Sequence, residues 1–291
     1  MPDALIVGCG YVGERLARVL PGDVRCLTRS AASAARLSGM GFDAVACDFD
    51  AELPPAELGE TSLAYYMIPP LKDSTRDDRL RRWLASLRSS PQRIVYLSTT
   101  AVYGDAGGAE VDETTPPAPT QGRGRARLDA EAALMEHARS HGIEWVILRV
   151  PGIYGPGRLP LDRITRRLPM LRESEAGPGN RIHVTDLVQA CVAAGARPGA
   201  AGRIYNVGDG DHASTTTYLR MVARLAGLPE PPEVERAEAE TVLPPMAWSF
   251  LTDSRRVNTR RMREELGVVP KFGRLEEGIR QALSTEALQG P

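Results

Sequence analysis

Three glycines near the start of the chain have the spacing of a phosphate-binding turn. Gly8, Gly10 and Gly13 form a G-x-G-x-x-G pattern directly after the apolar run 4–7. In such a turn the first glycine permits a tight bend, the second lets the backbone approach a diphosphate, and the third lets a helix pack on the strand. The N–H groups that begin this helix would then face the phosphates. The pattern therefore predicts a dinucleotide site; the alternative is a glycine turn without a ligand.

The residues after the second apolar run indicate which dinucleotide would bind. An acidic residue about 20 positions after the turn would hold the ribose 2′-hydroxyl of NAD, but Arg29 and Ser30 stand there. A guanidinium suits the 2′-phosphate of NADP, and no carboxylate is present to repel that phosphate. NADP is therefore favoured over NAD. Asp48, which closes the third apolar run, can reach the adenine amino group. The alternatives are a solvent-exposed Arg29 and an ordinary turn carboxylate at Asp48.

The elements that would position these residues alternate between apolar runs and helix-like segments. A helix is expected after the glycine turn, another over 124–140, and a third with Leu80 and Trp83 on its apolar face and Asp73 or Ser74 as its cap. Strands that are apolar throughout and separated by helices form a parallel sheet covered on both faces. The fold class predicted is α/β, with a Rossmann-type doubly wound parallel sheet. The six predicted strands are 4–7, 24–28, 42–48, 63–68, 93–99 and 144–150.

The pattern becomes less regular after residue 150. We expect residues 1–150 to form a dinucleotide-binding domain and residues 151–291 a small C-terminal substrate-binding lobe. The two are expected to be interleaved, with parts of 181–210 completing the first domain. Ser214 is expected to cap a helix, and the proline-rich stretch 229–245 to form a loop.

Composition excludes several classes of protein. The chain has 291 residues, of which 42% are hydrophobic and 25% charged, with a net charge of −1. This balance gives no drive toward nucleic acid or an anionic membrane, and no apolar run approaches the roughly 20 residues that span a bilayer. No secretion signal is recognisable, so a cytoplasmic location is expected. The four cysteines are scattered without a C-x-x-C pair, so neither a metal site nor a disulfide framework is predicted; they are Cys9, Cys26, Cys47 and Cys191.

Several further segments together resemble one family. They are "YLSTTAVYG" (96–104), "VDETTPPAP" (111–119), "LRVPGIYGPGR" (149–158), "RIHVTDLVQA" (181–190) and "YNVGDG" (205–210). With the glycine turn, they make the chain resemble the extended short-chain dehydrogenase/reductases, the NAD(P)-dependent epimerase/dehydratase family. The resemblance implies that substrate lies over the nicotinamide, in a cleft between the two parts of the chain. From the turn and the resemblance together, we expect cofactor contacts at Gly8, Gly10, Tyr11, Val12, Gly13, Arg29, Ser30, Asp48, Met67, Ile68, Pro69, Ser98, Arg127, Pro151 and Ile153.

The catalytic groups of that family are only partly present. The family uses a Ser or Thr with a Tyr-x-x-x-Lys pair, and Thr99, four residues before Tyr103, stands at the Ser/Thr place. The segment "TQGRGRARLDAE" puts Arg123 at the Tyr place and Arg127 at the Lys place, and no tyrosine or lysine occurs between Tyr103 and Tyr154. Arg127 can keep the ribose contacts and the positive charge. Arg123 cannot replace a phenol as proton carrier, because its pKa lies above about 12, although it can bind an anionic substrate group.

Other proton carriers remain open at this point. Tyr103, Tyr154 and His183 are candidates, each with packing or a structural hydrogen bond as the alternative. Asp112 and Glu113 are further candidates, with a solvated loop as the alternative.

Two functional hypotheses result. The first is an NADP-binding oxidoreductase or epimerase that acts on a small polar substrate, sugar-nucleotide-like or carbonyl, without the family pair. The second is a non-catalytic NAD(P)-binding sensor or scaffold. The expected partner is a small-molecule substrate, without nucleic acid or membrane. The resemblance also implies a possible homodimer through the helices near 73–90 and 124–140.

Overall fold

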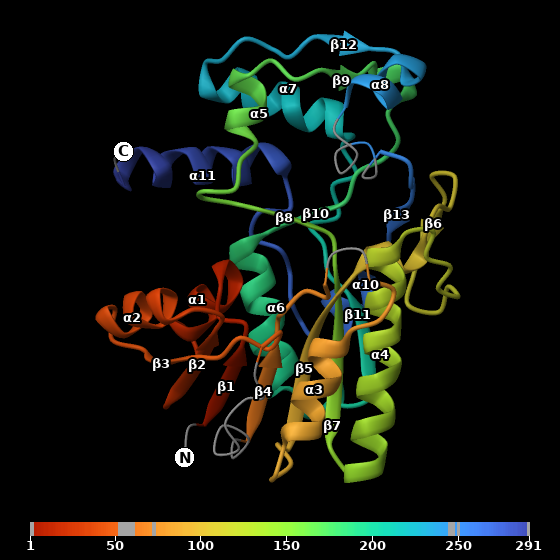
Figure 1. The fold of residues 1–291 in the computed structure, drawn as a ribbon. Coiled ribbons are helices and arrows are strands. Elements are labelled where there is room, and N and C mark those ends of the chain that lie inside the picture. The colour runs from red at the N-terminus through yellow and green to blue at the C-terminus, as the bar shows by residue number, and fades with distance from the viewer. Residues whose placement is uncertain (1–2, 52–61, 72–73, 244–247, 249–250, 290–291) are drawn as a thin grey trace.

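The apolar runs of the first half lie side by side in one parallel sheet (Figure 1). The computed structural model describes residues 3–51, 62–71, 74–243, 248 and 251–289. The sheet has seven strands in the order β11-β7-β5-β4-β1-β2-β3, and every neighbouring pair is parallel. This confirms the predicted Rossmann-type fold. The strands are β1 (Ala4–Val7), β2 (Val24–Thr28), β3 (Asp43–Ala46), β4 (Leu63–Tyr66), β5 (Arg93–Thr99), β7 (Glu144–Val150) and β11 (Arg203–Asn206).

Helices cover both faces of the sheet because the side chains on both faces are apolar. Alternate residues of one strand belong to opposite layers: Ile6 packs with the layer of α1 and α6, and Leu5 with that of α3 and α4. Such two-sided burial explains why these strands are continuous apolar runs. The helices beside the sheet are α1 (Tyr11–Ala17), α2 (Ala31–Gly39), α3 (Asp78–Ser86), α4 (Gly122–His141) and α6 (Val184–Ala196).

The caps of these helices differ in part from the prediction. The carboxylate of Asp77 accepts a hydrogen bond from the Leu80 N–H at 3.1 Å and caps α3, so the expected cap at Asp73 or Ser74 was wrong. Asp73 itself lies outside the described residues. The predicted cap at Ser214 is confirmed, since its hydroxyl accepts from the Thr217 N–H at 2.9 Å.

The order of the strands reverses at β1 and β4. Both lie at the centre of the sheet, and Val7 at the end of β1 is paired with Tyr66 at the end of β4. The glycine turn follows Val7, and Met67 follows Tyr66, so the turn and the segment after β4 meet at the carboxyl edge. In open α/β sheets this switch point is where ligands bind.

The segments after residue 150 contribute to two regions. β11 joins the large sheet, α6 packs on it and α10 (Arg260–Glu264) packs beside β11, whereas most of the other elements lie above the carboxyl edge (Figure 1). The division into two domains stays a prediction. The expected loop at 229–245 was wrong, since it contains β12 and α8. The remaining elements after residue 150 are β8 (Gly152–Tyr154), α5 (Leu161–Thr165), β9 (Met170–Leu171), β10 (Arg181–His183), α7 (Thr215–Ala226), β12 (Glu233–Val234), α8 (Arg236–Val242), β13 (Arg256–Val257) and α11 (Leu275–Gln289). Of these, β13 pairs with β6 (Glu110–Val111), which comes earlier in the chain.

Within the described residues, no helix combines the length and the apolar character needed to cross a bilayer.

Candidate functional site

Two adjoining cavities lie at the carboxyl edge of the sheet, around the switch point. The inner cavity has a volume of about 400 Å³ and the outer cavity about 280 Å³. They share residues of the glycine turn and of the segment after β4. The expected cofactor residues that line the inner cavity are Gly8, Gly10, Tyr11, Val12, Gly13, Met67, Pro69, Ser98, Arg127, Pro151 and Ile153, together with the catalytic candidate Thr99. Those that line the outer cavity are Gly8, Gly10, Arg29, Asp48, Met67, Ile68 and Pro69.

Each glycine of the turn is required for a different physical reason. Gly8 has φ of +91°, and a Cβ there would lie 2.7 Å from Ile68 Cγ1 and 2.9 Å from the Ile68 backbone nitrogen. A Cβ on Gly13 would lie 2.9 Å from Ile6 Cγ2, so only glycine lets α1 approach β1 this closely. A Cβ on Gly10 would meet no described protein atom within 4 Å, which leaves space for a ligand beside the backbone. The three roles match those expected of a diphosphate-binding turn.

The start of α1 has hydrogen-bond donors to offer. Gly10 precedes the helix and provides no side-chain cap, so the first N–H groups of α1 need another acceptor. Tyr11, Val12 and Gly13 of this first turn line the inner cavity. The residues present therefore fit the diphosphate of a dinucleotide.

Charged side chains surround the outer cavity. Arg29 is 71% exposed and forms ion pairs with Asp48 at 3.3 Å and Asp50 at 3.5 Å. The expectation that no carboxylate would stand near this guanidinium was therefore wrong, because the ends of β2 and β3 bring the three side chains together. Asp50 is also bound by both nitrogens of one edge of Arg79, with its Oδ1 2.6 Å from Nε. This contact lowers the pKa of Asp50. Ser30 lies outside both linings, and its hydroxyl caps α2 by accepting from the Ser33 N–H at 3.2 Å.

Arg127 lies where β4 and β5 end. Its Nη1 donates to the Leu97 carbonyl at 2.7 Å and to the Tyr96 hydroxyl at 3.0 Å. These contacts hold one edge of the guanidinium against the sheet, while Arg127 also lines the inner cavity. Tyr96 is fully buried, and burial raises its pKa to about 12. Arg127 can thus present a fixed positive charge to a ligand, but Tyr96 is not suited to proton transfer near neutrality.

Ser98 and Thr99 bring two hydroxyls to the end of β5. Thr99 Oγ1 accepts from the Ala101 N–H at 3.2 Å, at the start of the 3₁₀ helix Thr100–Tyr103. Its own proton therefore remains available for a ligand oxygen. Ser98 Oγ donates to Glu131 at 2.5 Å. Among the described residues of the cavity wall, the Ser98 and Tyr11 hydroxyls donate to protein acceptors, whereas the Thr99 hydroxyl only accepts.

A buried ion pair, missed in the sequence, lies behind Ser98. Glu131 of α4 is 0% exposed and Arg149 of β7 is 3% exposed, with Nη2 and Oε2 2.7 Å apart and Nε and Oε1 3.1 Å apart. Burial by itself would lower the pKa of Arg149, but the Glu131 carboxylate raises it above the ordinary value. Arg149 belongs to a segment that carried the family resemblance, and Glu131 ends the segment 120–131 in which the places of the catalytic pair were assigned. Their spacing of 18 residues across a helix and a strand gave no signal that they touch.

Arg123 is placed away from both cavities. It lies in the first turn of α4 and is not among the residues that line either cavity. Burial lowers its pKa, and the carboxylate of Asp253 acts in the opposite direction. Arg123 is thus under the electrostatic influence of Asp253, and it does not share the wall of the inner cavity with Thr99 and Arg127.

The other candidate proton carriers have structural roles. The Tyr103 hydroxyl donates to Asn206 Oδ1 at 2.8 Å. His183 is buried and precedes α6, where its Nδ1 accepts from the Thr185 N–H at 3.3 Å. Burial lowers the pKa of His183 to about 4. Tyr154 is buried in the lobe, and burial raises its pKa.

The carboxylates of the two acidic candidates, Asp112 and Glu113, already accept hydrogen bonds within the protein. Asp112 accepts hydrogen bonds from Thr114 and Thr115, and Glu113 accepts from the Asn206 N–H at 2.8 Å. Among the described residues that line the inner cavity, Tyr11 carries the only phenol, and none is histidine, aspartate or glutamate. The Tyr11 hydroxyl donates to the Pro156 carbonyl at 2.9 Å, and burial raises its pKa.

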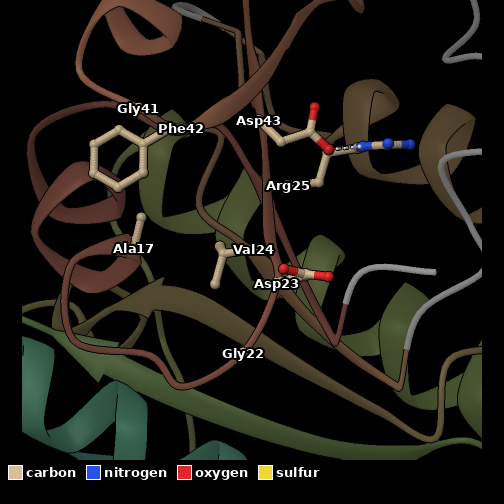
Figure 2. Close-up of a pocket in the computed structure, with 8 residues that line it drawn as sticks. All are labelled: Ala17, Gly22, Asp23, Val24, Arg25, Gly41, Phe42 and Asp43. Carbon is tan, nitrogen blue, oxygen red and sulfur yellow. Dashed lines mark hydrogen bonds and ion pairs between the residues drawn. The ribbon is translucent and has the colours of Figure 1, made fainter.

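A third cavity, of about 510 Å³, lies at the opposite edge of the sheet. Figure 2 shows its lining, which includes Asp23 and Val24 at the start of β2 and an ion pair of 2.7 Å between Arg25 and Asp43. It is larger than the other two, but it faces the amino ends of the strands, away from the switch point. The inner and outer cavities, which lie at the switch point, are therefore the candidate ligand site.

Comparisons with known proteins agree with this geometry. Residues 79–208 match the family model described as "NAD dependent epimerase/dehydratase family". Protein YeeZ of Escherichia coli K12 is 30% identical over 249 residues, which cover 80% of this chain and 86% of YeeZ. The UDP-glucose 4-epimerase of Azospirillum brasilense is 29% identical over 230 residues, which cover 69% of this chain and 63% of that enzyme. A solved structure of a functionally unknown conserved protein from Silicibacter pomeroyi superposes with a TM-score of 0.83 at 31% identity and covers 98% of this chain and 99% of that one.

Proposed function

The chain belongs to the NAD dependent epimerase/dehydratase family, and we propose from this that it binds NADP(H) across the inner and outer cavities. We propose further that it acts as an oxidoreductase or epimerase on a small polar substrate of the sugar-nucleotide kind. The observation that supports this most is the convergence of the glycine turn, Thr99 and Arg127 on one cavity. The similarity to UDP-glucose 4-epimerase supports the substrate class. The four cysteines are buried and form no disulfide within the described residues, which supports a cytoplasmic location.

The residues present assign separate tasks to the two cavities. When bound, the nicotinamide supplies hydride transfer at its C4 carbon. The hydrogen bonds of Arg127 to the described residues all use Nη1, and Nε and Nη2 are the donors that would bind the nicotinamide ribose. Thr99 donates its hydroxyl proton to a substrate oxygen and orients it. In the outer cavity Arg29 binds the 2′-phosphate and Asp48 accepts from the adenine amino group.

A specific observation favours the second candidate function, a non-catalytic dinucleotide sensor. The only phenol among the described residues lining the inner cavity donates its proton to a backbone carbonyl. A positioned acid–base group usually contributes about 10²- to 10⁴-fold in rate. A protein without one can keep the site for binding alone.

Stopped-flow absorbance of bound NADPH separates the two candidates. We expect the reduced nicotinamide band to fall when a small carbonyl compound is added to the NADPH-bound protein, and to rise when UDP-glucose or UDP-glucuronic acid is added to the protein loaded with oxidised NADP. Arg127→Ala should slow both changes. Arg125→Ala, an exposed position of the same helix, is the control. Tight NADPH binding without any change across the panel would support the sensor. Absence of NADPH and NADH binding would reject both candidates.

The cofactor preference is tested at Arg29. Arg29→Ala is expected to weaken NADPH binding about 10- to 100-fold, the range for a hydrogen bond to a charged group, and to change NADH binding less than about 2-fold. Isothermal titration calorimetry measures both. Arg36→Ala is the matched control, because Arg36 is an exposed arginine of α2 that pairs with Glu14 at 2.9 Å. Equal losses for NADPH and NADH would remove the proposed preference.

A further inference from the structure

Arg158 is a cation of the lobe that faces the glycine turn. It follows β8 in sequence, yet it lines the inner cavity together with Gly10 and Gly13. Its guanidinium carbon lies 4.4 Å from the centre of the Tyr11 ring. The contact is a cation–π interaction, and it keeps the charge at the wall of the cavity.

The guanidinium of Arg158 forms no ion pair with any of the described carboxylates. Within the described part of the chain, the Arg158 side chain is exposed, makes no hydrogen bond and lies within 4.0 Å of no carboxylate oxygen. Arg15, which packs on the same ring at 3.9 Å, differs in that it donates to the Tyr11 carbonyl at 2.9 Å. The guanidinium of Arg158 therefore keeps all its donors for a ligand, and their planar arrangement matches two phosphate oxygens at once.

The backbone that carries Arg158 is already fixed. The Tyr11 hydroxyl holds the Pro156 carbonyl at 2.9 Å, and the Gly157 N–H donates to Glu286 of α11 at 2.6 Å. Gly155 has φ of +144°, and a Cβ there would lie 2.9 Å from the Tyr11 oxygen. Little of the chain has to become ordered when an anion binds, which lowers the entropic cost of binding.

We propose that Arg158 binds the diphosphate of the dinucleotide and thereby ties the lobe to the glycine turn. The inference rests on the proposed function, since it takes a dinucleotide as the occupant of the inner cavity. The diphosphate would lie between the backbone of the turn and the guanidinium of Arg158. The diphosphate of a sugar-nucleotide substrate has the same chemistry, so the experiment separates the two sources.

The test compares Arg158→Ala, Arg158→Lys and wild type by calorimetry with ADP-ribose, adenosine and UDP. Arg158→Ala is expected to bind ADP-ribose about 10- to 100-fold more weakly than wild type and adenosine within about 2-fold. Arg158→Lys is expected to fall between, because it keeps the charge without the planar fork. Arg166→Ala is the matched control, an exposed arginine of the lobe that pairs with Asp162 at 3.5 Å. Thermal melting checks that every variant folds.

The results that would contradict the inference can be told apart from those that would contradict the proposed function. Unchanged ADP-ribose affinity in Arg158→Ala, with wild type binding normally, would overturn the inference and leave the proposed function standing. Weakened binding of UDP alone would assign Arg158 to a substrate diphosphate and also overturn it. Wild type that binds no ADP-ribose would reject the proposed function together with the inference.

Discussion

Gly10→Ala is expected to fold with the stability of wild type and to lose dinucleotide binding by more than about 100-fold. Gly10 has a negative φ of −104°, so alanine does not enter the left-handed region there, and its Cβ would meet no described protein atom within 4 Å. The methyl group would instead occupy the space into which the turn admits a diphosphate. A loss of this size is about 2.7 kcal/mol. Calorimetry with NADPH measures it, and urea denaturation measures the free energy of unfolding.

Gly8→Ala is the informative partner, since it is expected to lose both binding and stability. A Cβ at Gly8 would come within 2.9 Å of the Ile68 backbone nitrogen, and φ is +91°. Forcing a non-glycine residue into such a conformation costs about 1–3 kcal/mol. Gly39→Ala, where a Cβ meets no described atom within 4 Å, is the neutral control. Normal NADPH binding by Gly10→Ala would show that no ligand approaches the backbone of this turn.

The glycine turn and the central strands could be predicted because their causes are local. A strand buried on both faces must be apolar along its length, as in 93–99, and β5 spans those residues. Three glycines of fixed spacing after such a strand have few structural uses besides a close turn. For the same reason Gly8, Gly10 and Gly13 line the inner cavity as expected.

Helix starts in this chain depend on contacts that are distant in sequence. Asp77 rather than Ser74 caps α3, and the Asp77 N–H donates to Asp129 of α4 at 3.1 Å. Both positions satisfy the capping pattern, so the choice rests on the neighbouring helix. The helix α8 is similar: it begins where the Arg236 N–H donates to Glu175 at 3.0 Å, within a stretch whose prolines predicted a loop.

The sequence predicted which charged residues belong to the site, but not which residues they pair with. Arg29 stands at the rim of the outer cavity as expected, yet its pairing with Asp48 and Asp50 joins segments about 20 residues apart. Arg158 could not be predicted as a residue of the site, because only the packing of its segment on Tyr11 brings it to the glycine turn. Sequence spacing has no bearing on such contacts.

The ion pair between Glu131 and Arg149 gives the largest expected effect on stability. Removing one partner leaves the other charge buried and uncompensated, which costs about 3–5 kcal/mol. Glu131→Gln and Arg149→Met are each expected to lower the free energy of unfolding by about this amount. Urea denaturation of both variants measures the loss, and the double variant should recover part of it, since no unpaired charge then remains.

An exposed ion pair of the same helix provides the matched control for this pair. Glu136 and Arg139 are 2.8 Å apart, but their side chains are 64% and 76% exposed, so Glu136→Gln should cost less than about 1 kcal/mol. Equal costs for Glu131→Gln and Glu136→Gln would contradict the burial argument. Because Ser98 donates to Glu131 at 2.5 Å, Glu131→Gln should also weaken NADPH binding, whereas Glu136→Gln should not. The pair therefore connects the stability of the sheet to the wall of the ligand site.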